Sequence, residues 1–334
     1  MTRLTLIALA ALSLAAPTFA QDSQSSASQQ SQSSQSSSEA IDFSLPDGVD
    51  AKALGSRDVR VIAVQTMLDR SRHSPGVIDG YTGGNTNRAI RFYRKANGLS
   101  EGSAIDDALV KSLVETQGKA VFKTYTITEA DVKDGFQTIP SDFAKQSELD
   151  RLGYTSAVEM FGERFHMDQK FLKALNPDAD FTKAGTKLTI IAHGDESLSA
   201  DIARLEVRKS EGSVIALDGG GNVVASYPAT IGSSEFPSPS GNMQVNAIAA
   251  EPTYFFDPED QKWGPDKQFE IPAGPNNPIG GTWIDLGKEG YGIHGSPDPR
   301  KVSKRSSHGC VRLTNWDAEE LAKAVSTGTP VEFL

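Results

Sequence analysis

Three side chains near the end of the sequence could together perform nucleophilic chemistry. Cys310 is the only cysteine in the chain, and His294 and His308 are two of its five histidines. A thiol attacks a carbonyl group as its thiolate. Because a free cysteine titrates near about 8.5, the site must lower that pKa or supply a base. The sequence therefore predicts that Cys310 is a nucleophile assisted by a histidine.

The residues around Cys310 favour this interpretation over two simpler ones. Gly309 adjoins the thiol, where a backbone N–H could approach a reacting carbonyl without hindrance from a Cβ atom. The preceding residues 296–307 are polar and loop-like, which is poor material for a packed core. A lone cysteine is otherwise most often a small buried apolar residue. A metal site of His294, His308 and Cys310 is disfavoured because no fourth ligand or metal-like spacing is evident.

The stretch from Tyr291 to Trp316, YGIHGSPDPRKVSKRSSHGCVRLTNW, resembles the YkuD-type L,D-transpeptidase catalytic domain. The resemblance is to the ErfK/YbiS group of Gram-negative envelope enzymes. It implies that His294 is the base and that Cys310 is the nucleophile. It also implies that the backbone carbonyl of Gly295 orients the imidazole.

The same resemblance assigns the remaining parts of the site. Backbone groups around His308, Gly309 and Cys310 would form the oxyanion site, and Arg312 would lie beside the substrate. The planar guanidinium of Arg312 suits a carboxylate partner, although a solvated surface cation is the alternative. The other residues that we expect to contact substrate are Ser307, Tyr254 and Trp263.

The reaction that the resemblance implies is acyl transfer on peptidoglycan. Cys310 would attack the diaminopimelate carbonyl of a tetrapeptide stem and release the terminal D-alanine. A second stem's amine would then accept the acyl group, which gives a 3–3 cross-link. Water or an envelope protein as acceptor would make the same chemistry that of a carboxypeptidase, an amidase or a protein-attachment enzyme. A non-catalytic peptidoglycan-binding protein is a further alternative. No cofactor and no metal are expected.

Charge and the N-terminal residues indicate where the protein acts. The chain has 334 residues and a net charge of −10, which argues against a general nucleic-acid binder. Residues 1–20 have the pattern of a secretory signal peptide, with Arg3 before an apolar run that is too short to cross a membrane. Residues 21–45 are mostly Ser and Gln and should form a disordered linker. We therefore expect a periplasmic protein without a membrane span.

The predicted fold class is multidomain α+β, beginning with a small three-helix module at residues 46–118. Apolar spacing predicts one helix from Asp58, a second over Thr86 to Tyr93 and a third around Asp106 to Thr116. The module resembles the type 1 peptidoglycan-binding domain. The matching residues are Gln65, Pro75, Gly76, Asp79, Gly80, Thr86, Ala89, Ile90, Phe92, Gly98 and Leu99.

Residues 119–194 form the predicted middle segment. Strands are expected at Lys123 to Thr128 and Lys187 to Ile191, with two helices between them. The segment resembles a LysM glycan-binding repeat, and the likeness is carried by Asn176, Pro177, Gly185, Leu188 and Ile190. It departs from that pattern by an insertion at Ala130 to Gly153. A spacer without glycan affinity is the alternative.

Residues 200–334 are the predicted catalytic domain, mostly β with a C-terminal helix. A strand ending at His294 should deliver the base, and a helix should begin near Thr314. The Pro-, Gly- and aromatic-rich stretch from Ala250 to Pro278 has the length of a binding lid. This stretch contains Tyr254 and Trp263, which is why they are expected at the substrate.

Overall fold

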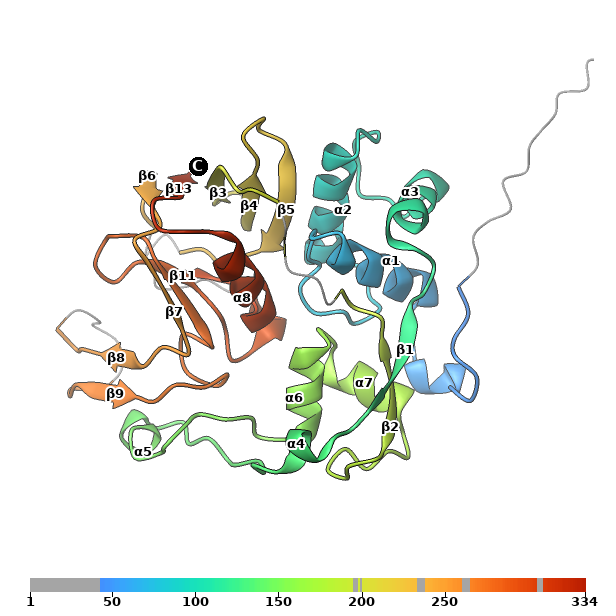
Figure 1. Cartoon of the computed structure of the whole chain (residues 1–334), viewed down its shortest axis with the longest axis horizontal. Coiled ribbons are helices and arrows are strands. Elements are labelled where there is room, and N and C mark those ends of the chain that lie inside the picture. Colours follow the sequence, from blue (N-terminus) through green and yellow to red (C-terminus); the bar gives the residue numbers. More distant parts are fainter. Residues whose placement is uncertain (1–42, 195–197, 199, 233–237, 260–264, 305–308) are drawn as a thin grey trace, which may run out of the picture. The chain divides into compact units, whose positions relative to one another are not determined.

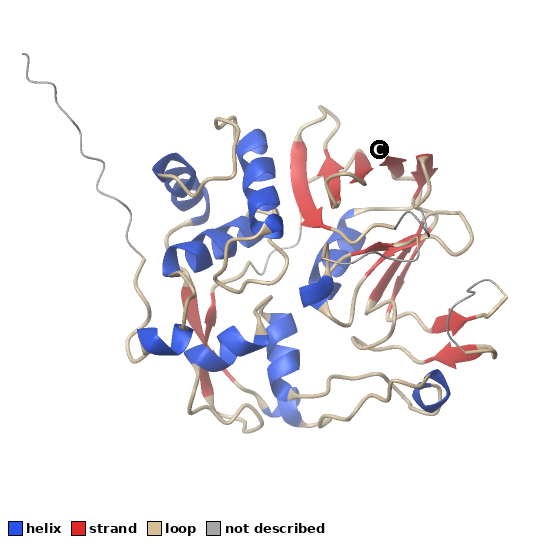
Figure 2. Cartoon of the chain, turned by 180° about the vertical axis from the view of Figure 1, so that it is seen from behind, coloured by secondary structure: helices blue, strands red, loops and turns tan. Residues whose placement is uncertain are grey.

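The computed structural model describes residues 43–334, except 195–197, 199, 233–237, 260–264 and 305–308 (Figure 1). The expected signal peptide and most of the expected linker therefore lie outside the described residues. Helices predominate before residue 180 and strands after it (Figure 2). Within the described part of the chain, no helix combines the length and apolar character that crossing a membrane requires.

The first region is a group of three helices behind a short 3₁₀ helix, as the sequence predicted. The elements are η1 (Ala51–Leu54), α1 (Val59–Arg70), α2 (Gly84–Ala96) and α3 (Asp107–Gln117). Helix α1 starts where it does because the Asp58 carboxylate accepts hydrogen bonds from the first backbone N–H groups. Phe43 and Leu45, which the prediction assigned to the linker, pack against the core of these helices. Their apolar side chains end the linker before residue 45.

Gln65 holds the loop between α1 and α2. Its side-chain Nε2 donates to Asp79 Oδ1 at 3.0 Å and to Thr86 Oγ1 at 3.1 Å. Its Oε1 accepts from the backbone N–H of Gly80 at 2.8 Å. Gln65 is 1 % exposed, so these bonds satisfy a buried amide that would otherwise be costly. Four residues of the peptidoglycan-binding-like pattern thus have a structural task in this chain.

The middle segment pairs two strands around a set of short helices. The elements are β1 (Phe122–Thr126), α4 (Glu129–Val132), α5 (Phe143–Gln146), α6 (Ala157–Arg164), α7 (Gln169–Leu175) and β2 (Lys187–Ile191). Strands β1 and β2 are antiparallel, with Phe122 opposite Ile191. The Asn176 side chain ties α7 to β2, since it donates to the Thr189 carbonyl and accepts from the Thr189 N–H.

The first two regions share one hydrophobic core. A single cluster of buried side chains extends from Phe43 to Ile191 and includes Met67 of α1, Leu113 of α3 and Phe161 of α6. The boundary predicted at residues 118/119 therefore does not separate two cores.

The last region contains two sheets and a hairpin. The strands are β3 (Arg204–Arg208), β4 (Ser213–Leu217), β5 (Val223–Pro228), β6 (Gly241–Gln244), β7 (Ala247–Ala250), β8 (Tyr254–Phe256), β9 (Phe269–Ile271), β10 (Thr282–Asp285), β11 (Gly292–His294), β12 (Val311–Arg312) and β13 (Pro330–Phe333). One sheet has the order β5-β4-β3-β13-β6 and the other β12-β11-β10-β7, while β8 and β9 pair as a hairpin. A short 3₁₀ helix, η2 (Pro299–Lys301), lies between β11 and β12.

Helix α8 (Asn315–Ala324) packs on the four-stranded sheet and closes its core. It begins at Thr314, whose hydroxyl accepts from the Asp317 N–H, as the sequence predicted. Leu321 of α8, Ile284 of β10 and Ile293 of β11 belong to one fully buried cluster. These side chains point from one face of the sheet toward α8. Because successive side chains of a strand point to opposite faces, the residues between them project from the other face.

The helical region also contacts the five-stranded sheet. Phe92 of α2 lies in a small buried cluster with Ile215, Leu217 and Val223 of strands β4 and β5. The backbone of residues 72–74 pairs with Ser226 at the edge of β5, with N–H to O distances of 2.8 and 2.9 Å. The N-terminal helices are therefore packed onto the catalytic region.

Candidate active site

Two neighbouring parallel strands bring the predicted nucleophile and base together. In the β11–β12 pair, Ile293 lies opposite Val311 and His294 lies opposite Arg312. Cys310, one residue before β12, consequently falls beside Gly292. Because side chains alternate along a strand, Cys310, Arg312 and His294 all project from the same face of the sheet. The buried Ile293 and Val311 project from the other face, toward α8.

His294 is held as a neutral imidazole. Its Nδ1 lies 2.7 Å from the Gly295 carbonyl oxygen. A carbonyl only accepts hydrogen bonds, so Nδ1 carries the proton and Nε2 keeps its lone pair. The ring is 2 % exposed and stacks on Trp283 with centroids 5.7 Å apart. Burial, with a smaller contribution from the Arg312 charge, lowers the pKa of His294 to about 3.

Cys310 is held as a neutral thiol. Its Sγ lies 3.1 Å from the Gly290 carbonyl oxygen. Burial raises the pKa of Cys310, although the Gly292 backbone and the Arg312 charge act in the opposite direction. With the pKa of the base lowered and that of the thiol raised, the two resting side chains do not form a thiolate–imidazolium pair. The thiol can therefore react only if a base removes its proton during attack.

Gly309 has the backbone conformation that makes it hard to replace. Its φ is +115°, and a Cβ at this position would lie 3.1 Å from a ring carbon of Tyr291. The Gly309 carbonyl accepts a 2.6 Å hydrogen bond from the hydroxyl of Ser238, which is itself buried. Ser238 also accepts from the Gly232 N–H at 2.9 Å. Ser238 was missed as a site residue, although it lies in the PSPSGNM turn that the sequence displays.

Arg312 provides a positive charge at the site with unused hydrogen-bonding capacity. Burial lowers the pKa of Arg312, and the charges of Cys310 and Tyr254 oppose that shift. Its buried Nε finds no hydrogen-bond partner among the residues that the structure describes. The backbone of Arg312 is fixed by a mutual pair of 2.8 Å bonds with Thr230. β12 thus positions the side chain, and no described residue uses its Nε–H as a donor.

Asn315 lies behind the base and was also missed. A Cβ placed on Gly295 or Gly280 would come within 2.1 or 2.0 Å of Asn315 Oδ1, so neither glycine can be replaced without movement. Asn315 Nδ2 donates to Glu163 Oε1 at 2.8 Å and to the Pro275 carbonyl at 3.1 Å. The sequence offered only the weak signal of an asparagine at a helix start.

Three residues predicted at the site cannot be placed. Ser307, His308 and Trp263 lie outside the described residues. The metal site that the sequence disfavoured would use His308 as a ligand, so that site also lies partly outside the described residues. Among residues that are described, no three His, Cys, Asp or Glu side chains are arranged to hold a metal ion.

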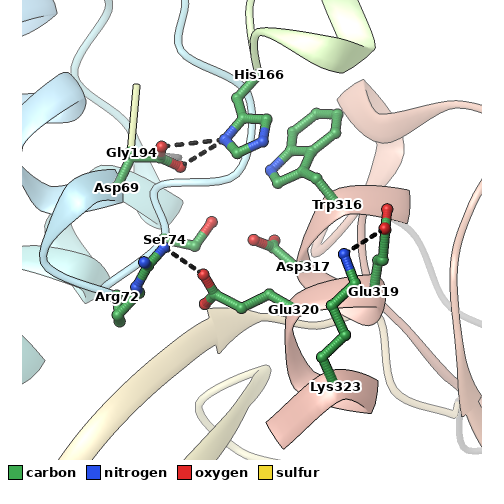
Figure 3. Close-up of a pocket in the computed structure, with 10 residues that line it drawn as sticks. All are labelled: Asp69, Arg72, Ser74, His166, Gly194, Trp316, Asp317, Glu319, Glu320 and Lys323. Atoms are coloured by element: carbon green, nitrogen blue, oxygen red, sulfur yellow. Dashed lines mark hydrogen bonds and ion pairs between the residues drawn. The ribbon is translucent and has the colours of Figure 1, made fainter. Parts of the chain in front are cut away.

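A separate cavity of about 200 Å³ lies between the helical region, the middle segment and α8 (Figure 3). It contains neither Cys310 nor His294. Its residues are Asp69, Arg72, Ser74, His166, Gly194, Trp316, Asp317, Glu319, Glu320 and Lys323. Three ion pairs line it: Arg72 with Glu320, His166 with Asp69, and Lys323 with Glu319 within α8. The charged residues of this cavity thus belong to the packing between regions, away from the thiol.

The strand geometry and the protonation states define a class of site: a cysteine nucleophile with a neutral histidine base, which is suited to acyl transfer. Residues 202–333 match the family model of YkuD, the L,D-transpeptidase catalytic domain. This match is the one that the sequence motif predicted.

Curated relatives carry the same family name. The putative L,D-transpeptidase YkuD of Bacillus licheniformis is 44% identical over 18% of this chain and 36% of its own length. The probable L,D-transpeptidase YbiS of Escherichia coli K12 is 29% identical over 54% of this chain and 61% of its own length. The chain thus spans between about a third and three fifths of these relatives. Among solved structures, an Enterococcus faecium L,D-transpeptidase C442S mutant has a TM-score of 0.32 at 21% identity, covering 40% of this chain and 50% of that one.

Proposed function

We propose that this chain is an exported L,D-transpeptidase that cross-links peptidoglycan stem peptides in the Gram-negative periplasm. The observation that carries the proposal is the parallel pairing of β11 with β12, which sets Cys310 and His294 on one face of the sheet. The family of residues 202–333 supports acyl transfer by the thiol. The signal-like residues 1–20 support export.

In the acylation step, the Cys310 sulfur attacks the carbonyl of the diaminopimelate–D-alanine bond as its proton passes to Nε2 of His294. The carbon–sulfur bond forms and the carbonyl oxygen becomes an oxyanion. Backbone N–H groups at Gly309 and Cys310 donate to it, a contribution of about 3 kcal/mol per donor. The carbon–nitrogen bond then breaks, and the imidazolium protonates the departing D-alanine amine.

In the transfer step, the amine of a second stem attacks the thioester. His294 takes the proton of that amine, the carbon–nitrogen bond forms, and the carbon–sulfur bond breaks. The thiolate of Cys310 recovers its proton from the imidazolium, which restores the resting pair. A neutral base is suited to both steps because it can accept a proton at the start of each one.

Substrate positioning is assigned to Arg312 and Tyr254. The guanidinium of Arg312, whose Nε has no partner within the described part of the chain, suits a carboxylate of the stem peptide, since a planar guanidinium donates in a fixed fork. Tyr254 lies on the hairpin beside it. Ser307, His308 and Trp263 keep the roles given by the family resemblance as proposals.

Incubation of purified protein with disaccharide-tetrapeptides tests the proposal. Transfer to a second stem yields dimers with loss of one alanine per cross-link. Free tripeptide would instead identify water as the acceptor, and addition to an envelope protein would be seen only when that protein is supplied. The Cys310→Ala variant is the control and should form no product. Unchanged substrate with the wild-type protein would leave a peptidoglycan-binding role without catalysis.

A further inference from the structure

The insertion that separates the middle segment from a LysM repeat reaches the catalytic region. This insertion segment (Ala130–Gly153) leaves α4, forms the one-turn helix α5 and returns before α6. Figures 1 and 2 both show α5 beside the β8–β9 hairpin, and α5 contacts β9. A spacer would have no reason to extend to that hairpin.

Aromatic packing joins α5 to the hairpin. The Phe143 ring meets the Phe256 ring edge to face, with centroids 5.2 Å apart. The Phe143 ring also meets the Tyr254 ring edge to face, with centroids 6.3 Å apart. Tyr254 and Phe256 are two positions apart on β8, so both rings project from the face that Phe143 covers. Phe256 is 1 % exposed, whereas Phe255, on the other face, is 67 % exposed. The insertion segment therefore covers one face of the hairpin, and the other face is exposed.

Hydrogen bonds join the end of the insertion segment to the chain that follows the hairpin. The Leu152 N–H donates to the Ala273 carbonyl at 2.9 Å, and the Asn276 N–H donates to the Leu152 carbonyl at 3.1 Å. The Asn276 side chain donates to the Gly153 carbonyl at 2.9 Å. At Gly274, whose φ is +144°, a Cβ would lie 2.1 Å from the Leu152 oxygen. This close approach leaves room for glycine only.

The β8–β9 hairpin and the chain around Asn276, which the insertion segment contacts, both lead to the candidate active site. The chain after Asn276 carries Gly280, where a Cβ would lie 2.7 Å from the carbonyl carbon of Gly295, the residue that follows His294. The hairpin carries Tyr254, whose charge acts on the pKa of Arg312. The insertion segment thus contacts the two walls of the site, although it lies more than a hundred positions before them in the sequence.

We propose that the insertion segment is a working part of the active site, in which Phe143 acts as a positioning residue that sets the β8–β9 hairpin for the donor stem peptide. The proposal rests on the proposed function for its substrate. The positioning of the hairpin does not depend on the proposed function, because the ring contacts and the Leu152 hydrogen bonds exist without ligand. Phe143 touches neither Cys310 nor His294 through any ring contact or hydrogen bond found in the described residues.

Steady-state kinetics with the tetrapeptide substrate measure this role. Phe143→Ala should raise KM about tenfold and change kcat less than threefold, because the reacting pair is not altered. Phe143→Tyr keeps an aromatic ring and should restore the wild-type KM. The matched control is Phe181→Ala, a half-buried phenylalanine of the same middle segment that packs on its own core. A KM for Phe143→Ala equal to that of Phe181→Ala would overturn the proposal.

Hydrogen–deuterium exchange on the full chain tests the positioning without any substrate. Phe143→Ala should speed amide exchange in β8 and β9 at least tenfold and leave β3 to β5 unchanged, while Phe181→Ala leaves the hairpin protected. Hairpin exchange at the wild-type rate would refute the role of Phe143. Absence of turnover by the wild-type protein would instead refute the proposed function, and the exchange result would still decide the positioning.

Discussion

A buried and a half-buried histidine in this protein have opposite electrostatic environments. His294 of the active site and His166 of the cavity in Figure 3 each place Nδ1 against an oxygen, at 2.7 Å and 3.0 Å. The oxygen belongs to the Gly295 carbonyl in the first case and to the Asp69 carboxylate in the second. Both rings also stack on a tryptophan, Trp283 and Trp316 respectively.

The charge of the partner decides how each ring is protonated. For His294, burial lowers the pKa to about 3 and only backbone carbonyls oppose it. For His166, burial also lowers the pKa, but the charge of Asp69 and its hydrogen bond outweigh that effect and the net shift is upward. The carbonyl dipole beside His294 therefore leaves the imidazole neutral, whereas the Asp69 carboxylate favours the protonated form of His166.

The strongest test of this contrast exchanges each histidine for glutamine. His294→Gln should lower kcat/KM about 1000-fold, since general-base assistance is lost, and leave the unfolding midpoint nearly unchanged. His166→Gln is the matched control and should retain kcat within a few-fold. Tetrapeptide turnover together with urea unfolding measures both effects. Equal activity losses in the two variants would remove the distinction between them.

The pH dependence of Cys310 alkylation tests the neutral state of the pair. Because burial raises the pKa of the thiol, its thiolate fraction at pH 7 is below that of free cysteine. Iodoacetamide should therefore react about tenfold more slowly than with free cysteine, and the rate should continue to rise above pH 8.5. The label can be read by mass spectrometry, with Cys310→Ala as the blank. A rate that is already constant below pH 7 would indicate a resting thiolate instead.

Asp317→Asn tests the acidic side of the cavity in Figure 3. Burial raises the pKa of Asp317 to about 7; Asp69 adds to the shift, and His166 and hydrogen bonds from Thr314 and Ser74 reduce it. A raised carboxyl pKa means that stability is greatest below about pH 4 and is lost as the pH rises to 7.

The variant lacks this titration and keeps a polar amide in place of the carboxyl. It should therefore be more stable than the wild type by about 2 kcal/mol at pH 8 and gain nothing at pH 4.5. Denaturant unfolding at the two pH values measures the difference. Asp201→Asn, at an exposed position, provides the control. A gain that is the same at both pH values would contradict the assignment to titration.

The smallest expected effect is the pH dependence of the His166 pair itself. Because the folded pKa of His166 is raised, its contribution to stability is complete below about pH 6.5 and is lost as the pH rises through the folded value. His166→Gln should thus cost about 1 kcal/mol more at pH 6 than at pH 9. Asp69→Asn should abolish that difference, since the carboxylate raises the pKa. A loss of equal size at both pH values would show that the pair is neutral.

Local sequence patterns were sufficient to predict the elements that hold the candidate site. The strand that ends at His294 and the helix start at Thr314 were both predicted, and the Ile-His-Gly and His-Gly-Cys motifs proposed His294 and Cys310 as the reacting residues. These predictions succeed because the spacing of a strand or a helix is expressed within a few residues.

The features that the sequence did not reveal depend on contacts between distant segments. Ser238 lies in a loop and Asn315 at a helix start, and neither stands out until the fold places it against Gly309 or Gly295. The contact of Phe143 with the β8–β9 hairpin joins two segments that are distant in the sequence, and no pattern near Phe143 indicates it. The protonation states of the reacting pair depend on burial, which a motif does not express.

The parallel arrangement of β11 and β12 has a consequence for how this domain can vary. The gap between sulfur and imidazole is fixed by the spacing of adjacent strands and by the hydrogen bond from the Leu313 N–H to the His294 carbonyl. The described residues of the crossover that contains η2, 295–304, take no part in this strand pairing. Lengthening or shortening the crossover therefore changes what surrounds the reacting atoms without moving them apart, so substrate preference can diversify there while the chemistry stays constant.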